Sequence, residues 1–191
     1  MDNIRKQIEE SLKVKKLILE DDLILQSIKE SAEICIAALK SNNKILFAGN
    51  GGSAADAQHL AAELVNRFGF DRPGLSAIAI TTDTSVITSI SNDYSFDKLF
   101  SRQIQALSKS GDVLIALSTS GNSTNIVEGL KEAKKTGIKT IGLTGTSGGK
   151  MEPICDICLK VPSKETPRIQ EAHILIGHII CSIIEDSLFV R

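Results

Sequence analysis

A glycine-rich turn followed by a histidine and a glutamate marks the part of the sequence best equipped for chemistry. The turn is Gly49-Asn50-Gly51-Gly52-Ser53, and His59 and Glu63 follow it. Residues four apart share one face of a helix. The pair therefore predicts either half of a metal site or an acid–base pair. The alternative is an ordinary surface pair that adds a few tenths of a kcal/mol to helix stability.

The turn itself has the composition of a phosphate-binding loop. It follows a short β-type run, Lys44-Ile45-Leu46-Phe47, and it opens an alanine-rich helix. Glycines let the backbone approach an anion, and the free N–H groups of a helix start point at it. Ser53 stands where either a helix N-cap or a phosphate-binding hydroxyl would stand. We therefore predict a phosphate cradle beside the His59/Glu63 pair.

A second polar loop, Ser118-Thr119-Ser120-Gly121-Asn122-Ser123, places four hydroxyl groups at a predicted strand-to-helix turn. Several hydroxyls together with backbone N–H groups make a neutral phosphate site. The alternative is a helix N-cap, for which one serine would suffice. The Gly-Lys-Ser/Thr pattern of a nucleotide loop is missing here, and the turn at 49–53 lacks the third-glycine spacing of a dinucleotide fingerprint. The two loops predict a sugar phosphate as ligand and no nucleotide cofactor.

The predicted last helix, residues 167–188, is apolar on most faces but carries Gln170, Glu171, His173 and His178. For each histidine alone, the simplest interpretation is a hydrogen-bonded core histidine, because a polar group on an apolar helix needs a partner. Gln170 and His178 lie about 12 Å apart along an ideal helix. A metal shared by both would need side chains that reach inward or that come from different subunits. A helix that is apolar all round is buried either in a core or in a subunit interface. In a chain of only 191 residues we expect the interface, and hence an oligomer.

The elements that must position these residues follow from alternating periodicities. Two leading helices, expected to pack as an antiparallel pair, are predicted over 3–20 and 22–40. Strands are predicted at 44–48, 76–80, 113–117, 139–144 and 157–161, and helices between them end near 68, 93, 107 and 136. This alternation predicts a doubly wound α/β fold, a five-stranded parallel sheet flanked by helices. We expect a single domain over 1–191, with a helical pair in 1–40 and the α/β core and C-terminal interface helix in 41–191. Both loops leave carboxyl ends of strands, where such sheets bind ligands.

Composition excludes several classes of function. Hydrophobic residues make up 42% and charged residues 24% of the chain, as in ordinary globular proteins. A formal net charge of −1 provides no basic field for nucleic acid or for a membrane surface. The apolar runs are shorter than a membrane span, and the start of the chain lacks the apolar core of a signal peptide, so we expect a cytoplasmic protein. The four cysteines are interpreted as small, reduced side chains, although Cys155-x-x-Cys158 has the spacing of half a zinc site.

Together, the turn at 49–53, the His59-x-x-x-Glu63 pair, the serine loop at 118–123 and the run Arg168-Ile169-Gln170-Glu171-x-His173 with His178 resemble one family. The family is that of the phosphoheptose isomerases of the sugar-isomerase (SIS) domain superfamily, and the resemblance runs essentially from end to end. It implies conversion of sedoheptulose 7-phosphate to D-glycero-D-manno-heptose 7-phosphate, the first step toward ADP-heptose for lipopolysaccharide core. It also implies a homotetramer with active sites between subunits.

The resemblance further implies roles for individual residues. Glu63 and His178 would be the catalytic acid–base pair, and zinc, in members that bind it, would be held at His59, Glu63, Gln170 and His178. The implied substrate contacts are Asn50, Gly51, Gly52, Ser53, Glu63, Arg67, Asn92, Asp93, Ser118, Thr119, Ser120, Ser123 and Gln170. One departure stands out: Thr166-Pro167 occupy the place where some members carry an aspartate that contacts the substrate.

Aldose–ketose isomerisation needs a base over one carbon, an acid for the carbonyl oxygen and stabilisation of an enediolate. We assign Glu63 as the base and His178 as the acid, with the exchanged assignment left open, and zinc as Lewis acid and template. Two competing interpretations are non-catalytic. One is a relative that binds a replication initiator and lacks the acid–base pair, and the other is a sugar-phosphate sensor. The presence of both Glu63 and His178 favours the enzyme.

Overall fold

A computed structural model describes residues 1–190 and alternates helices and strands along the chain. The strands are β1 (Ile45–Gly49), β2 (Ala77–Ala79), β3 (Val113–Leu117), β4 (Lys139–Thr144) and β5 (Ile157–Lys160). The helices are α1 (Asp2–Leu19), α2 (Asp22–Lys40), α3 (Gly52–Val65), α4 (Thr84–Asp93), α5 (Leu99–Leu107), α6 (Thr124–Lys135) and α7 (Thr166–Leu188). A 3₁₀ turn, η1 (Phe96–Lys98), precedes α5, where the sequence predicted one continuous helix.

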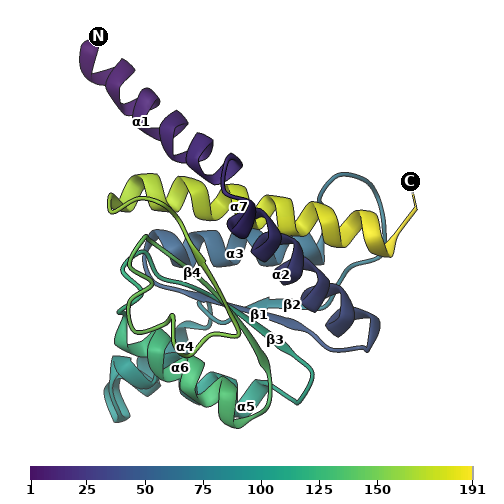
Figure 1. Ribbon diagram of the computed structural model, residues 1–191. Coiled ribbons are helices and arrows are strands. Elements are labelled where there is room, and N and C mark those ends of the chain that lie inside the picture. The colour runs from purple at the N-terminus through teal and green to yellow at the C-terminus, as the bar shows by residue number, and fades with distance from the viewer. Residues whose placement is uncertain (191) are drawn as a thin grey trace.

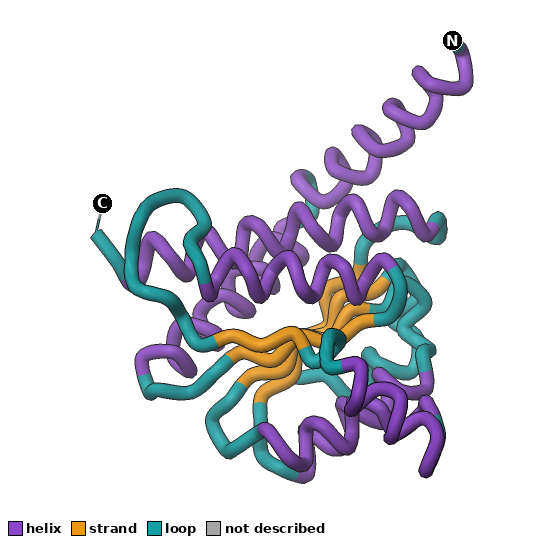
Figure 2. Tube along the Cα trace, turned by 180° about the vertical axis from the view of Figure 1, so that it is seen from behind, coloured by secondary structure: helices purple, strands orange, loops and turns teal. Residues whose placement is uncertain are grey.

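The five strands form one parallel sheet in the order β2-β1-β3-β4-β5. Helices α2, α3 and α7 cover one face of this sheet, and α4, α5 and α6 cover the other (Figure 1). The view from behind shows the same three layers (Figure 2). The predicted doubly wound fold is confirmed. Its strand order reverses between β1 and β3, and such a switch point is where open α/β sheets bind ligands.

Both faces of the sheet are apolar because both are covered by helices. Ile45 and Phe47 of β1 pack into the cluster formed with α2, α3 and α7, whereas Leu46 and Ala48 pack into the cluster formed with α5 and α6. This explains why the central strands β1 and β3 are continuous apolar runs in the sequence rather than alternating ones. The rigid double-sided core fixes the strand ends from which the two polar loops emerge.

The first helix does not fold back on the second, so the predicted antiparallel pair is wrong. Helix α2 continues in roughly the direction of α1, and the first turns of α1 project away from the body (Figure 1). Helix α1 buries Val14 and Ile18 near its end. Its apolar residues Ile4, Ile8 and Leu12 are 60%, 55% and 60% exposed, although a helical hairpin would have covered them. The reason is that the apolar face of α2 packs against α7 and the sheet, and is not available to α1.

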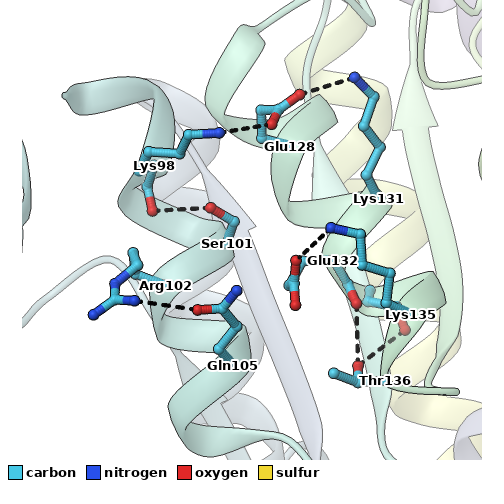
Figure 3. A network of polar contacts seen from close by, with 10 residues as sticks. Lys98, Ser101, Arg102, Gln105, Glu128, Lys131, Glu132, Lys135 and Thr136 are labelled. Carbon is cyan, nitrogen blue, oxygen red and sulfur yellow. Dashed lines mark hydrogen bonds and ion pairs between the residues drawn. The ribbon is translucent and has the colours of Figure 1, made fainter. Parts of the chain in front are cut away.

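A surface network of charges links η1 and α5 to α6 (Figure 3). Glu128 accepts from Lys131 at 2.8 Å and from Lys98 at 3.0 Å, and these two cations lower the pKa of its carboxyl group to about 2. Lys135 pairs with Glu132 at 3.1 Å. Exposed pairs of this kind contribute at most about 1 kcal/mol each. Because these lysines are paired with carboxylates, the network is a solvated helix face and not an anion site.

Helix α7 also carries a histidine that is part of the core. His173 is fully buried, and its Nε2 lies 3.2 Å from the carbonyl oxygen of Thr144. The interpretation of a hydrogen-bonded core histidine is therefore confirmed for this residue. Within residues 1–190, no helix is both long enough and apolar enough to span a membrane.

Burial lowers the pKa of His173 from 6.5 to about 4, and this predicts a pH-dependent stability. Between these values the unfolded chain binds a proton that the folded chain does not. The stabilisation is thus complete above pH 6.5 and is lost as the pH falls toward 4, by up to about 3 kcal/mol. Urea unfolding between pH 4 and 8 measures this slope. The His173→Leu variant should show a smaller slope below pH 6.5, and an unchanged slope would contradict the assignment.

Candidate functional site

The glycine turn and the serine loop lie side by side at the switch point of the sheet. Gly49, at the end of β1, pairs in register with Leu117 at the end of β3. A reciprocal amide pair then joins the loops: Asn50 donates to Asn125 at 2.8 Å, and Asn125 donates back at 2.9 Å. Asn125 was not singled out from the sequence, because an asparagine early in a helix gives no sign of a partner 75 residues away.

The first backbone N–H groups of the two helices that follow these loops are only partly satisfied. Ser53 donates to the carbonyl oxygen of Asn50 at 3.0 Å, and Ile126 donates to the side chain of Asn125 at 2.9 Å. Among the described residues, neither Gly51 before α3 nor Ser123 before α6 makes a side-chain cap hydrogen bond, whereas Asp21 and Asp83 cap α2 and α4. Ser53 is the second residue of α3, so the N-cap alternative for it is wrong. The cap position has φ +55°, which glycine adopts without strain. Two adjacent uncapped helix starts make a strong anion site.

The serine loop is held in place by hydrogen bonds within the loop and by one from the turn after β4. The hydroxyl groups of Ser118 and Ser123 lie 3.0 Å apart, and the hydroxyl of Ser120 accepts from the backbone of Asn122 at 3.1 Å. The turn after β4 braces the loop, since Gly145 donates to the carbonyl oxygen of Thr119 at 2.9 Å. The structure thus gathers four of the predicted hydroxyl-bearing residues in one preorganised loop.

Replacing Gly121 by alanine should disrupt this loop and weaken anion binding. Gly121 has φ +65°, and an added Cβ would lie 2.2 Å from the carbonyl oxygen of Gly148. Because backbone on both sides would have to shift, we expect binding of inorganic phosphate to weaken at least about tenfold, or 1.4 kcal/mol. Calorimetric titration with phosphate measures the loss. Gly137→Ala, also at positive φ but with an added Cβ only in ordinary contact, 3.8 Å from Oγ of Ser110, is the control that should bind normally.

Two and three turns after the start of α3, His59 and Glu63 meet His178 of α7. The Nε2 atom of His59 lies 3.0 Å from Oε1 of Glu63 and 2.9 Å from Nε2 of His178. One ligand atom from each residue lies within 4.8 Å of the others. We call this cluster the His/Glu/His triad. Glu63 and His178 are half-buried, and His59 is 51% exposed, so the triad is open to a ligand.

A glycine and an aromatic ring allow this meeting of α3 and α7. A Cβ on Gly177 would lie 2.5 Å from the side chain of Leu60, so the missing side chain lets the helices approach closely. The ring of Phe68 lies 5.7 Å from the ring of His178, and the rings of His59 and His178 are 5.1 Å apart. Packing of this kind restricts the orientation of both imidazoles.

Asp56 is a further polar residue beside the triad that the sequence analysis missed. Its Oδ2 atom is buried without a hydrogen-bond partner in the described part of the chain. Burial raises the pKa of the carboxyl group, and the nearby His59 and His178 oppose that rise. Its position three residues before His59, on the same helix face, was the available signal. A carboxylate beside imidazoles commonly orients them through their second ring nitrogen.

The triad fits a divalent cation of the zinc type. Nitrogen ligands on one tetrahedral zinc, each about 2.0–2.1 Å from the ion, lie roughly 3.3 Å apart. The His59–Glu63 and His59–His178 separations of 3.0 and 2.9 Å are close to that spacing. One proton on His59 Nε2 cannot satisfy both neighbours, whereas a cation between the three groups would. Two imidazoles and a carboxylate are also the donor set of many zinc sites.

The remaining predicted residues lie in three places. The side chain of Gln170 approaches Gly52, where an added Cβ would be 2.6 Å from its Nε2 atom, and thus sits at the glycine turn. Arg67 is exposed just beyond α3. Asn92 and Asp93 end α4, hydrogen-bonded to each other at 2.9 Å, on the other face of the sheet from α3 and α7 (Figure 1). Within one chain, the structure brings neither of them to the triad.

Comparisons with known proteins agree with this geometry. A family model described as the SIS domain matches residues 12–145. The phosphoheptose isomerase of Aneurinibacillus thermoaerophilus is 56% identical over 188 residues, which are 98% of this chain and 95% of that protein. The solved phosphoheptose isomerase from Neisseria gonorrhoeae has a TM-score of 0.91 and 43% identity over 98% of both chains. That from Francisella tularensis has a TM-score of 0.93 and 38% identity over 97% of both. The chain therefore belongs to the SIS-domain family and, within it, to the phosphoheptose isomerases.

Proposed function

We propose that this protein is an aldose–ketose isomerase that converts sedoheptulose 7-phosphate to D-glycero-D-manno-heptose 7-phosphate. The observation that carries the proposal is the His/Glu/His triad on α3 and α7, with α3 itself opening at the glycine turn on the switch point of the sheet. Family membership supplies the class of reaction. The product would enter the route to ADP-heptose and lipopolysaccharide core.

The phosphate group is bound by the loops at the ends of β1 and β3. Their hydroxyl groups and the N–H groups at the helix starts bind the anion through hydrogen bonds, without a cationic side chain. The residues proposed to contact the substrate are Asn50, Gly51, Gly52, Ser53, Glu63, Arg67, Asn92, Asp93, Ser118, Thr119, Ser120, Ser123 and Gln170. Holding the phosphate at one end places the other end of the sugar, with its carbonyl group, toward α3 and α7.

Glu63 and His178 move the protons of the reaction. Glu63 takes the proton from C1 of the ketose, and His178 donates a proton to the carbonyl oxygen on C2, which gives an enediol. The carboxylic acid then returns its proton to C2, while the C1 hydroxyl loses its proton to the imidazole and becomes the aldehyde. Both groups end in their starting states. The half-buried positions of the two side chains suit this exchange, because a catalytic acid or base must reach the substrate.

Zinc is the proposed cofactor, held by His59, Glu63, Gln170 and His178. When bound, it would polarise the oxygens of the sugar as a Lewis acid. His59 would supply a ligand atom. It also restricts the orientation of the His178 imidazole, because the two rings are in contact. The side chain of Gln170 would have to turn from Gly52 toward the triad to join the set.

We further propose that the chain works as a single domain over residues 1–191 in a cytoplasmic homotetramer with active sites at the subunit interfaces. The exposed stripe Ile4, Ile8 and Leu12 on α1 supports assembly, since exposed apolar surface commonly marks an interface. The position of Asn92 and Asp93 supports shared sites. They end α4 on the opposite face of the sheet from the triad, so we place them at a triad of another subunit.

Turnover of sedoheptulose 7-phosphate by the purified protein tests the function. It should be measured as isolated, after chelation, and after zinc is added back. Activity that is lost on chelation and restored by zinc supports both the reaction and the metal. Activity that resists chelation keeps the isomerase and removes zinc from the proposal. Binding of the sugar phosphate without turnover would overturn the enzymatic function.

A further inference from the structure

A buried arginine closes the carboxyl end of α3, the helix that carries His59 and Glu63. Arg72 donates from Nη2 to the backbone carbonyl of Glu63 at 2.8 Å and from Nη1 to that of Leu64 at 2.6 Å. It also reaches the carbonyl of Asn66 at 3.3 Å. The last carbonyls of a helix have no partners within the helix. Here one planar guanidinium group donates hydrogen bonds to several of these carbonyls. One of them is the carbonyl of Glu63, a residue of the triad.

The same arginine is bound by a buried carboxylate of α7. Glu185 accepts from Nε of Arg72 at 2.9 Å, and the two side chains are 1% and 2% exposed. Its carboxylate also accepts the backbone N–H groups of Phe68 at 2.9 Å and Gly69 at 2.6 Å. These interactions lower the pKa of Glu185 against the effect of burial. The pair therefore stays ionised and joins α3, the following turn and α7.

The Arg72–Glu185 ion pair is connected to the triad through both α3 and α7. On α7, Glu185 lies seven residues after His178, which places the two side chains on the same face two turns apart. On the other side, Arg72 holds the backbone of Glu63, and Glu185 holds the backbone of Phe68, whose ring packs against His178. Two of the three triad residues are thus tied to one buried ion pair. Within residues 1–190, no hydrogen bond joins the side chain of Arg72 or Glu185 to a side chain of the triad.

We propose that Arg72 and Glu185 are positioning residues that set the register of α3 against α7 and so hold Glu63 and His178 at reacting distance. The inference rests on the isomerase function proposed above. A catalytic constellation must be held within about 0.5 Å of its working geometry. Loss of the pair should therefore affect the chemical step and metal affinity beyond what a loss of stability alone would do.

The chain offers a matched control at the opposite end of the sheet. Asp112 is a fully buried carboxylate that accepts the backbone N–H groups of Lys44 and Lys109 and pairs with the ammonium group of Lys44. Its environment has the same composition as that of Glu185: two amides and one cation. It precedes β3, however, whereas the site lies beyond the carboxyl end of that strand.

The experiment compares Glu185→Gln with Asp112→Asn at a temperature where both are fully folded by circular dichroism. We expect Glu185→Gln to lower kcat at least tenfold with KM changed less than threefold, because the phosphate loops are untouched. We expect its affinity for Co²⁺, read from the absorption of the bound ion, to fall by about 10–100-fold, as for residues that orient metal ligands. Asp112→Asn should keep both kcat and Co²⁺ affinity within twofold of wild type.

Equal effects of the two variants on kcat and Co²⁺ affinity would overturn the proposal and leave the pair a purely structural element. If Glu185→Gln does not fold, the double variant Arg72→Met/Glu185→Leu replaces the pair with apolar side chains, a change that proteins often tolerate. Its full kcat would likewise overturn the proposal. A wild-type protein without turnover would refute the isomerase function, and the Co²⁺ comparison would still decide whether the pair positions the triad.

Discussion

Replacing Glu63 by glutamine should lower kcat for sedoheptulose 7-phosphate by about 10²–10⁴-fold, the usual contribution of a general acid or base. His178→Gln should have an effect of the same size. Glutamine keeps the length of each side chain approximately but cannot exchange a proton at neutral pH. KM should change little, because the phosphate is held by the loops at 49–53 and 118–123. Steady-state kinetics of the purified variants measures both constants.

The double variant Glu63→Gln/His178→Gln refines this prediction. Groups that act as one unit are strongly non-additive, so the double variant should be about as slow as either single variant. Glu132→Gln, which changes a half-buried glutamate of α6 paired with Lys135, is the control and should turn over normally. If both single variants kept wild-type kcat, the assignment of the acid–base pair would be wrong.

Replacing Arg72 by alanine should reduce the free energy of unfolding by about 3–5 kcal/mol, as expected when one partner of a buried ion pair is removed. The variant leaves the carboxylate of Glu185 buried with its cation gone. It also removes the guanidinium donor from the carbonyls of Glu63 and Leu64, of which the second keeps the N–H of Leu75 at 3.0 Å. For a chain of this length, 1 kcal/mol corresponds to about 2–4 °C in Tm. The midpoint should fall by roughly 6–20 °C in a thermal melt followed by circular dichroism.

An exposed ion pair provides the comparison for this stability prediction. Lys131→Ala removes one of the two cations that bind Glu128 on the surface of α6 (Figure 3). Such exposed pairs contribute about 0–1 kcal/mol, so the Tm of this variant should remain within a few degrees of wild type. A small change for both variants would mean that Arg72 is compensated by water or by its neighbours.

Much of the fold followed from local sequence patterns. The continuous apolar run Val113–Leu117 and the segment Lys139–Thr144 became strands with the predicted bounds. The loops at 49–53 and 118–123 were recognisable because glycines and hydroxyls cluster there within a few residues. The direction of α1 was not predictable, since the periodicity of a helix shows an apolar face but not which surface will cover it.

Only those parts of the site whose residues are close together in the sequence were predictable. His59 and Glu63 share a helix face by their spacing, and this required no fold. Their meeting with His178, 119 residues away, rested on the family resemblance, because spacing carries no information on contacts between separate helices. The partners of Asn125, Arg72 and Glu185 are likewise distant in sequence. A buried charge has no local signature, and Arg72 lies between the helix predicted to end near 68 and the strand predicted at 76–80.

The first three turns of α1 have a consequence for how the N-terminus behaves in solution. Most of the apolar area that would hold this helix in place is exposed on the single chain, and an isolated helix of 18 residues is only marginally stable in water. Backbone amides there open without any need for global unfolding. Residues 2–11 should therefore exchange amide hydrogen for deuterium almost freely in a dilute monomer. Protection of these amides that grows with protein concentration would report self-association through this helix.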